Sequence, residues 1–144
     1  MDYIQRELIK SLNENRHHLT TKMDMIISDL AEHCSHEQLK GFVHTSISEK
    51  TNSLRLFFQD LVFTIDTQKK FAFDNSYNVG VKTSFYNGDD FICSAALSRE
   101  GFVEIKNSFN DEVLKYEYDA VDLSKAILHV LLLTSHQKGY IWLG

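Results

Sequence analysis

The sequence predicts an α+β fold in which helices flank a single antiparallel sheet. The first 38 residues contain no glycine and carry apolar side chains at helical spacing. Between residues 41 and 119 apolar and polar residues alternate in short runs that turn sequences separate. Residues 120–144 return to a helical pattern. A chain of 144 residues, 43% of them hydrophobic, fits one core, so we assign 1–144 to a single domain.

The first segment, residues 1–38, is expected to form two helices. One apolar stripe ends at Leu12, and a second begins at Leu19 and continues at steps of three and four residues. The polar run between the stripes can start a new helix, and Thr21 followed by Asp24 is a weak N-cap pattern. One long helix is the alternative, because several of the same apolar residues also fit a heptad.

The middle segment predicts an antiparallel meander of about six to seven strands, because its connections are too short for parallel crossovers. Asn87 and Gly88 stand between alternating runs and predict a two-residue hairpin in which Tyr86 lies opposite Asp89. The alternation changes phase at residues 59 and 60. This change predicts a bulge, with a tight turn as the alternative.

The last segment, residues 120–144, predicts a helix packed on the sheet, a stop at Gly139 and a short terminal strand. Between residues 126 and 133 only His129 is polar, so the helix is apolar almost all the way round. A helix with water behind it would show a polar half. We therefore expect its second face to be covered by the N-terminal helices or by a second copy of the chain in a homodimer.

The net charge of −5 and the pI near 5.8 argue against nucleic-acid binding, which needs a basic face. No apolar run reaches the length of a membrane span, so we expect a cytoplasmic protein that does not bind membranes. The two cysteines, Cys34 and Cys93, lie in very different segments and are expected to be free buried thiols.

No motif in the sequence indicates catalysis or a cofactor, so we predict neither catalytic residues nor a bound cofactor. Asp29, His33 and His36 can share one helix face and could offer ligands to zinc or nickel. The order typical of helical metalloprotease sites is absent. We interpret these residues as a solvated helix end and predict no metal site.

These features favour a small acidic protein-binding module, such as an inhibitor, an immunity-type protein or a chaperone, that captures a macromolecule without catalysis. Aromatic residues with parity opposite to their buried neighbours would lie on an uncovered sheet face, with acidic residues around them to attract a basic protein. The predicted partner-binding residues are Phe57, Tyr86, Asp89, Asp90, Phe102 and Glu104.

The alternative function is a small-ligand-binding protein or an enzyme. Its pocket would lie between the sheet and the C-terminal helix, with His129 buried near Tyr116 or Tyr118. A hydrogen bond to one of these tyrosines, or to a strand carbonyl, is the ordinary explanation of a buried histidine.

Overall fold

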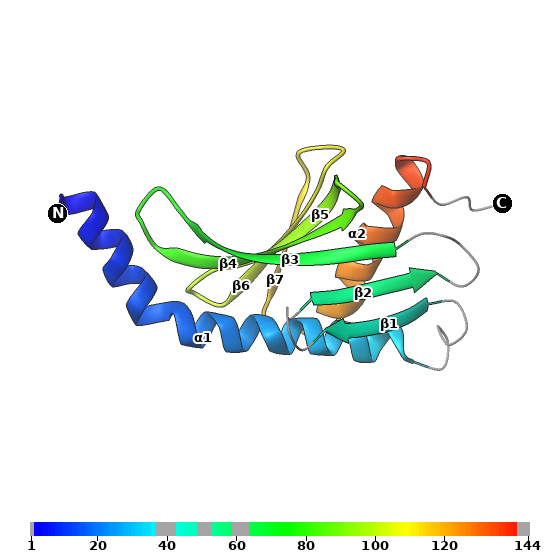
Figure 1. Cartoon of the computed structure of the whole chain (residues 1–144), viewed down its shortest axis with the longest axis horizontal. Helices are drawn as coiled ribbons and strands as arrows, with labels where there is room; N and C mark the ends of the chain where they lie inside the picture. The colour runs from blue at the N-terminus through cyan, green and yellow to red at the C-terminus, as the bar shows by residue number, and fades with distance from the viewer. Residues whose placement is uncertain (1, 37–42, 49–52, 59–63, 141–144) are drawn as a thin grey trace.

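The computed structural model describes residues 2–36, 43–48, 53–58 and 64–140 (Figure 1). It has an α+β architecture, in which an N-terminal helix, an antiparallel sheet and a C-terminal helix follow one another along the chain. The elements are α1 (Tyr3–Cys34), β1 (Val43–Ser48), β2 (Ser53–Phe58), β3 (Thr64–Phe73), β4 (Val79–Asn87), β5 (Asp90–Leu97), β6 (Phe102–Asn107), β7 (Val113–Glu117) and α2 (Leu123–Gln137).

The prediction of two N-terminal helices is wrong, because α1 is one helix of 32 residues along the length of the molecule (Figure 1). The polar stretch at 13–18 is mostly exposed and lies inside the helix. Without glycine or proline, such a stretch keeps its helical hydrogen bonds and simply faces water. The helix is capped by Asp2, whose side chain accepts a hydrogen bond from the Gln5 amide at 2.8 Å. Thr21 and Asp24 lie in the helix interior.

The predicted meander is confirmed: the sheet has seven strands in the order β1-β2-β3-β4-β5-β6-β7, and every neighbouring pair is antiparallel. The phase change at residues 59 and 60 lies outside the described residues. The strands on either side of it, β2 and β3, are antiparallel neighbours with Leu56 opposite Ile65. One continuous bulged strand could not pair with itself in this way, so the bulge prediction is wrong.

The β4–β5 hairpin forms as predicted, but its loop is displaced by one residue. Asn87 still pairs with Asp90, so the loop residues are Gly88 and Asp89, and Gly88 has a φ of +61°. Tyr86 therefore lies opposite Phe91 rather than Asp89. A register shift between Phe85 and Tyr86 accompanies this pairing, so one extra residue of β5 is accommodated there.

Both helices pack on one face of the sheet, which we call the inner face. Helix α1 contacts β4, α2 contacts β5 and β6, and the two helices contact each other. Alternate residues of the strands point into the core between the sheet and the two helices. The largest of these side chains, Phe85, is fully buried. The opposite face, which we call the outer face, has neither helix over it.

Helix α2 is covered on two sides, as its composition predicts. Leu131 is fully buried and Leu128 is 4% exposed, whereas Leu133 on the remaining side is 43% exposed. The second cover is α1 of the same chain, so burial of this helix does not require a second copy. Gly139 has a φ of +82° just beyond the helix, as predicted for a C-terminal stop. The terminal strand expected from residue 140 onward lies almost entirely outside the described residues.

Within the described residues, neither helix contains a segment with the length and apolar character needed to cross a membrane.

Candidate functional site

The outer face is the surface of the sheet that the described helices leave uncovered. Side chains that alternate with the buried core residues point to this face. Two rows of directly opposed residues cross it. The first row consists of Arg55, Asp66, Tyr86 and Phe91, and the second of Lys70, Lys82, Ala96, Glu104 and Lys115.

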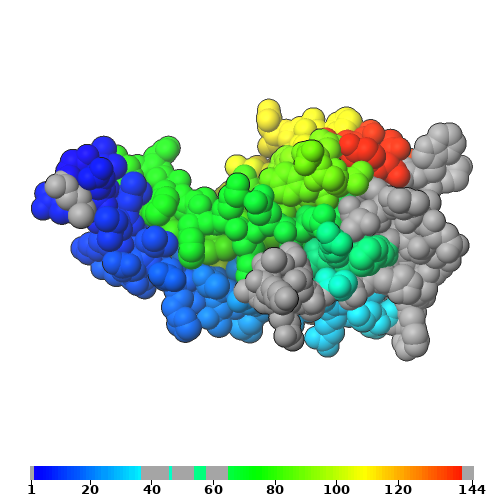
Figure 2. All heavy atoms as spheres, in the orientation of Figure 1, coloured from blue at the N-terminus to red at the C-terminus, as the bar shows by residue number. Residues whose placement is uncertain are grey.

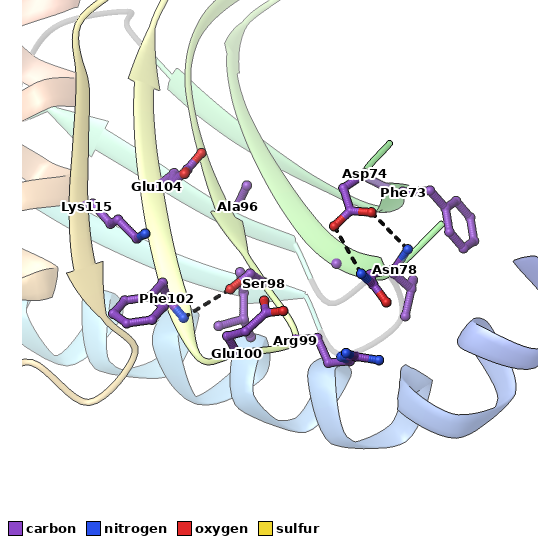
Figure 3. A pocket seen from close by; sticks show the side chains of 14 residues that line it. Phe73, Asp74, Asn78, Ala96, Ser98, Arg99, Glu100, Phe102, Glu104 and Lys115 are labelled. Carbon is purple, nitrogen blue, oxygen red and sulfur yellow. Dashed lines mark hydrogen bonds between the residues drawn. The ribbon is translucent and has the colours of Figure 1, made fainter. Parts of the chain in front are cut away.

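A hollow of about 450 Å³ lies at one end of this face, between the β3–β4 hairpin and the turn from β5 to β6. In Figure 2 the outline of the molecule falls between the green projection formed by the β3–β4 hairpin and the lime and yellow strands beyond it. Small residues contribute to its lining, namely Ala72, Gly80 and Ala96, and the Phe102 ring adds aromatic surface (Figure 3). The hollow exists because three neighbouring strands carry small side chains here.

Charged groups surround the apolar part of this hollow. The Lys115 ammonium lies over the Phe102 ring, 4.5 Å from its centre, and Glu104 lies opposite Lys115 on the neighbouring strand. Arg99 and Glu100 are exposed in the turn at the other side (Figure 3). Phe102 is held by its backbone, because its amide donates to the Ser98 hydroxyl at 3.2 Å. An aromatic ring fixed in place and flanked by charges suits recognition of a protein side chain.

A second hollow of about 360 Å³ adjoins the β4–β5 turn and is lined by Asp66, Gln68, Tyr86 and Asp89. The Tyr86 ring meets the Phe91 ring edge to face, with 5.9 Å between their centres.

Two lysines lie opposite each other between the two hollows. Lys70 on β3 and Lys82 on β4 are direct cross-strand partners, and Lys82 also lies 5.8 Å from the centre of the Phe91 ring. Like charges in directly opposed positions destabilise a sheet unless an anion lies near them. This part of the outer face is therefore suited to an acidic group of a partner.

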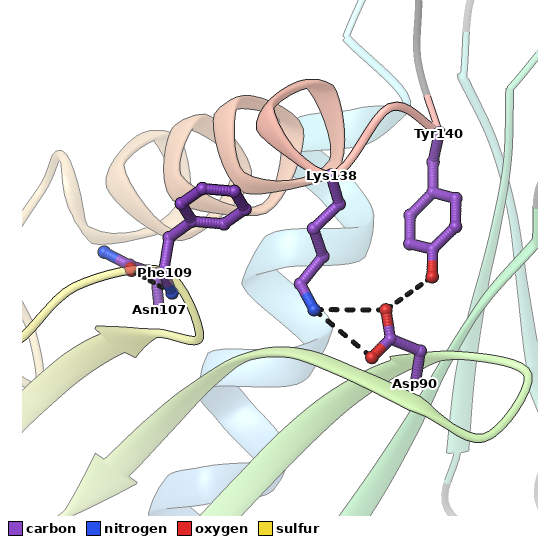
Figure 4. Close-up of polar contacts among 5 residues, drawn as sticks. All are labelled: Asp90, Asn107, Phe109, Lys138 and Tyr140. Atoms are coloured by element: carbon purple, nitrogen blue, oxygen red, sulfur yellow. Dashed lines mark hydrogen bonds and ion pairs between the residues drawn. The ribbon is translucent and has the colours of Figure 1, made fainter.

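The structure places Asp90 on the inner face, where it binds the end of α2 (Figure 4). Its carboxylate accepts hydrogen bonds from the Lys138 ammonium, at 3.1 and 3.2 Å, and from the Tyr140 hydroxyl. The Tyr140 bond, followed by the Lys138 bond, lowers the pKa of Asp90 below its usual value, and the same contact raises the pKa of Tyr140. Asp90 thus fixes the C-terminal end of α2 and lines neither hollow of the outer face.

The other predicted partner-binding residues fall into two groups. Tyr86 and Asp89 line the hollow at the β4–β5 turn, and Phe102 and Glu104 line the larger one. Phe57 lies on β2, four strand spacings or about 19 Å from β6, and contributes to neither hollow.

The sequence interpretation missed the lining residues Gly80, Ala96, Arg99 and Lys115. On three neighbouring strands, the residues at these outward-facing positions are small. This pattern is the signal in the sequence that could have indicated a depression in the sheet.

The alternative pocket differs from its prediction. His129 is exposed, and with Glu112, Asn107 and Gln137 it lines a hollow of about 330 Å³ between α2 and β6 and β7. Tyr116 and Tyr118 are not among its lining residues. His129 lies between the buried residues Leu128 and Val130 in the sequence, but it is on the side of α2 that faces away from the core.

The acidic and histidine residues at the end of α1 line a further hollow of about 370 Å³ together with Asp119. Its lining includes the residues considered above as metal ligands, Asp29, His33 and His36. Among the described residues, no set of three or more histidine, cysteine or acidic side chains has a geometry that could hold a metal ion.

Both cysteines are free and buried, as predicted. Burial raises the pKa of Cys34 to about 11 and that of Cys93 to about 12. A thiol with so high a pKa is protonated at neutral pH and is a poor nucleophile or metal ligand. Neither thiol is therefore suited to catalysis.

Comparisons of this chain with protein-family models, with curated protein sequences and with solved structures find no match.

Proposed function

We propose that the protein is a non-catalytic binding module that captures a protein partner on the outer face of its sheet. The observation that carries the proposal is the larger hollow around Phe102, on a face with neither helix over it. A partly exposed aromatic ring in a depression, flanked by charges, is typical of the few residues that dominate binding energy in protein interfaces. Inhibitors, immunity-type proteins and chaperones are the classes that act by such capture.

Charge supports a partner that is basic overall. The net charge of −5 and the exposed acidic groups Asp89 and Glu100 at the strand ends would attract such a protein over long distances. The contact itself would include an acidic group of the partner over Lys70 and Lys82. The proposed complex therefore uses charge to steer association and the apolar hollow to hold the partner.

A photo-crosslinking experiment tests the proposal in extracts of the native cell. A benzophenone amino acid replaces Phe102 in one protein and Phe109 in a matched control. Phe109 is 53% exposed but lies in the β6–β7 turn, outside the lining of both outer-face hollows. We expect a specific protein to crosslink at position 102 and not at position 109.

The identified partner then allows a quantitative test. Phe102→Ala should weaken its affinity at least about 10-fold, because a central aromatic anchor contributes more than 1 kcal/mol to binding. Phe109→Ala should leave the affinity unchanged. Equal crosslinking at both positions, or equal affinity of both alanine variants, contradicts the assignment of the outer face.

The hollow beside His129 supports a second function, the binding of a small polar ligand. Its volume of about 330 Å³ lies at the lower end of the range for ligand sites, and Glu112 and Gln137 add polar groups. A screen of small molecules by ligand-observed NMR tests it. Ligands that bind the protein but not the His129→Ala variant would support this function, and ligands that bind both equally would exclude this hollow as their site.

A further inference from the structure

Strand β7 forms one edge of the sheet, and its backbone amides on that edge are available for pairing. The Tyr118 amide donates to the Gly101 carbonyl at 2.9 Å. Because the direction of the backbone groups alternates along a strand, the amides of Tyr116 and Leu114 also point to β6. The amides of Val113, Lys115 and Glu117 consequently point away from the sheet. Val113 is 42% exposed, and Lys115 and Glu117 are exposed as well. In the described part of the chain, no turn, loop or side-chain hydrogen bond uses these three amides.

An edge strand with a central lysine normally resists pairing with another chain, because the charge would face that chain. Here Glu117 follows Lys115 two residues later, so both side chains lie on the outer face. When two copies of such a strand pair antiparallel, the register decides which charges meet. Among the residues of β7 itself, Val113–Glu117, only one register places opposite charges against each other.

Four two-fold registers show the difference. An axis through Lys115 places the two lysines opposite each other, and an axis through Glu117 does the same with the two glutamates. An axis through Leu114 places Glu117 opposite Asp111. An axis through Tyr116 places each Lys115 opposite Glu117 of the second copy, twice in the same dimer. It also aligns the residues whose amides point outward, as an antiparallel ladder requires.

We propose that β7 pairs antiparallel with β7 of a second copy, about a two-fold axis through Tyr116, to form a homodimer with one continuous sheet. The contact is made by the outward backbone groups of Lys115 and Glu117 and by their two cross-strand ion pairs. The Glu117 carbonyl also accepts the Ala120 amide at 3.1 Å within its own chain, so it is shared in the dimer.

The dimer leaves the outer faces of both copies accessible and brings the second copy close to the larger hollow. Lys115 lines that hollow, so Glu117 of the second copy adds a carboxylate at its rim. The proposal concerns a different surface from that of the captured protein and does not depend on it.

Sedimentation velocity over a range of protein concentrations tests the register through charge reversal. Lys115→Glu and Glu117→Lys each replace both opposite-charge pairs by like-charge pairs, so each should weaken dimerisation at least about 10-fold. The double variant Lys115→Glu/Glu117→Lys should dimerise like the wild type. An equimolar mixture of the two single variants should form a heterodimer, since both contacts are again complementary.

Glu14→Lys is the matched control, because Glu14 is exposed on α1 and not on the sheet. It makes the same change in charge as Glu117→Lys and should leave dimerisation unchanged. Circular dichroism confirms that each variant is folded. A wild-type protein that sediments as a 16.7 kDa monomer at every concentration overturns the proposal. Single variants that dimerise like the wild type, or a double variant that stays weakened, overturn it too.

Discussion

Ser11 joins the N-terminal half of α1 to the sheet through one buried hydrogen bond. Its hydroxyl oxygen accepts from the Val79 amide at 2.9 Å, and the two residues are 9% and 1% exposed. Where β3 turns into β4, the Asp74 amide donates to the Asn78 carbonyl, so these two residues form a hydrogen-bonded pair. Phe73 and Val79 are the next opposed pair, and in an antiparallel ladder such a pair is not hydrogen-bonded. The Val79 amide therefore points away from β3.

The amide points toward the β5 side of β4. The pairing of β4 with β5 begins at Val81 and Leu97, so no residue of β5 lies opposite Val79. The Ser11 hydroxyl thus supplies the acceptor that no strand provides. Ser11→Ala leaves a buried donor without a partner, which costs about 1–3 kcal/mol. Alanine also raises helix propensity by up to about 0.5 kcal/mol. The expected net loss is about 1–2 kcal/mol of the free energy of unfolding.

Urea unfolding followed by circular dichroism measures this loss. Ser28→Ala is the matched control, because Ser28 is exposed on the same helix. The control gains the same propensity without losing the bond, so the difference between the two variants isolates the hydrogen bond. If the two free energies of unfolding agree within about 0.3 kcal/mol, smaller than any cost expected for a buried unpaired amide, the reasoning is refuted.

Three further predictions concern backbone strain, pH and thiol reactivity. Tyr77 has a φ of +63°, which asparagine tolerates better, so Tyr77→Asn should raise the free energy of unfolding by about 1 kcal/mol in urea titrations. A decrease would mean that contacts of the ring outweigh the strain. Asp90→Asn should lower the melting temperature near neutral pH. Because folding lowers the pKa of Asp90 from 3.8, its stabilisation is present above that pH and is lost as the pH falls through the folded-state pKa. Melting curves of the two proteins should therefore converge in acid, and a difference independent of pH contradicts this role. Cys34 and Cys93 should resist alkylation at about pH 8 until the protein is unfolded in urea, as measured by mass spectrometry. Rapid modification of the folded protein would show that the burial is incorrect.

The site could be predicted only in part, because parity identifies a face but not a place on it. Phe102 and Glu104 have the outward parity that the sequence indicates, and they line the same hollow. The sequence indicates Asp90 only as an acidic neighbour of the aromatic residues. Its position directly after the displaced loop turns it to the inner face, where it meets Lys138, 48 residues away in the sequence. Its role depends on this contact with the end of α2, which no local pattern specifies.

The sequence by itself determined the features that neighbouring residues specify. Alternation with short turns is enough to predict an antiparallel meander, and a nearly all-apolar helix that stops at Gly139 is enough to predict burial on two sides. Tertiary structure decided the features that depend on distant residues. It kept α1 continuous through its polar stretch, since contacts at Ser11 and from Leu19 onward hold both halves against the same domain. The bond from Val79 to Ser11 spans 68 residues, and no local pattern encodes such a partner.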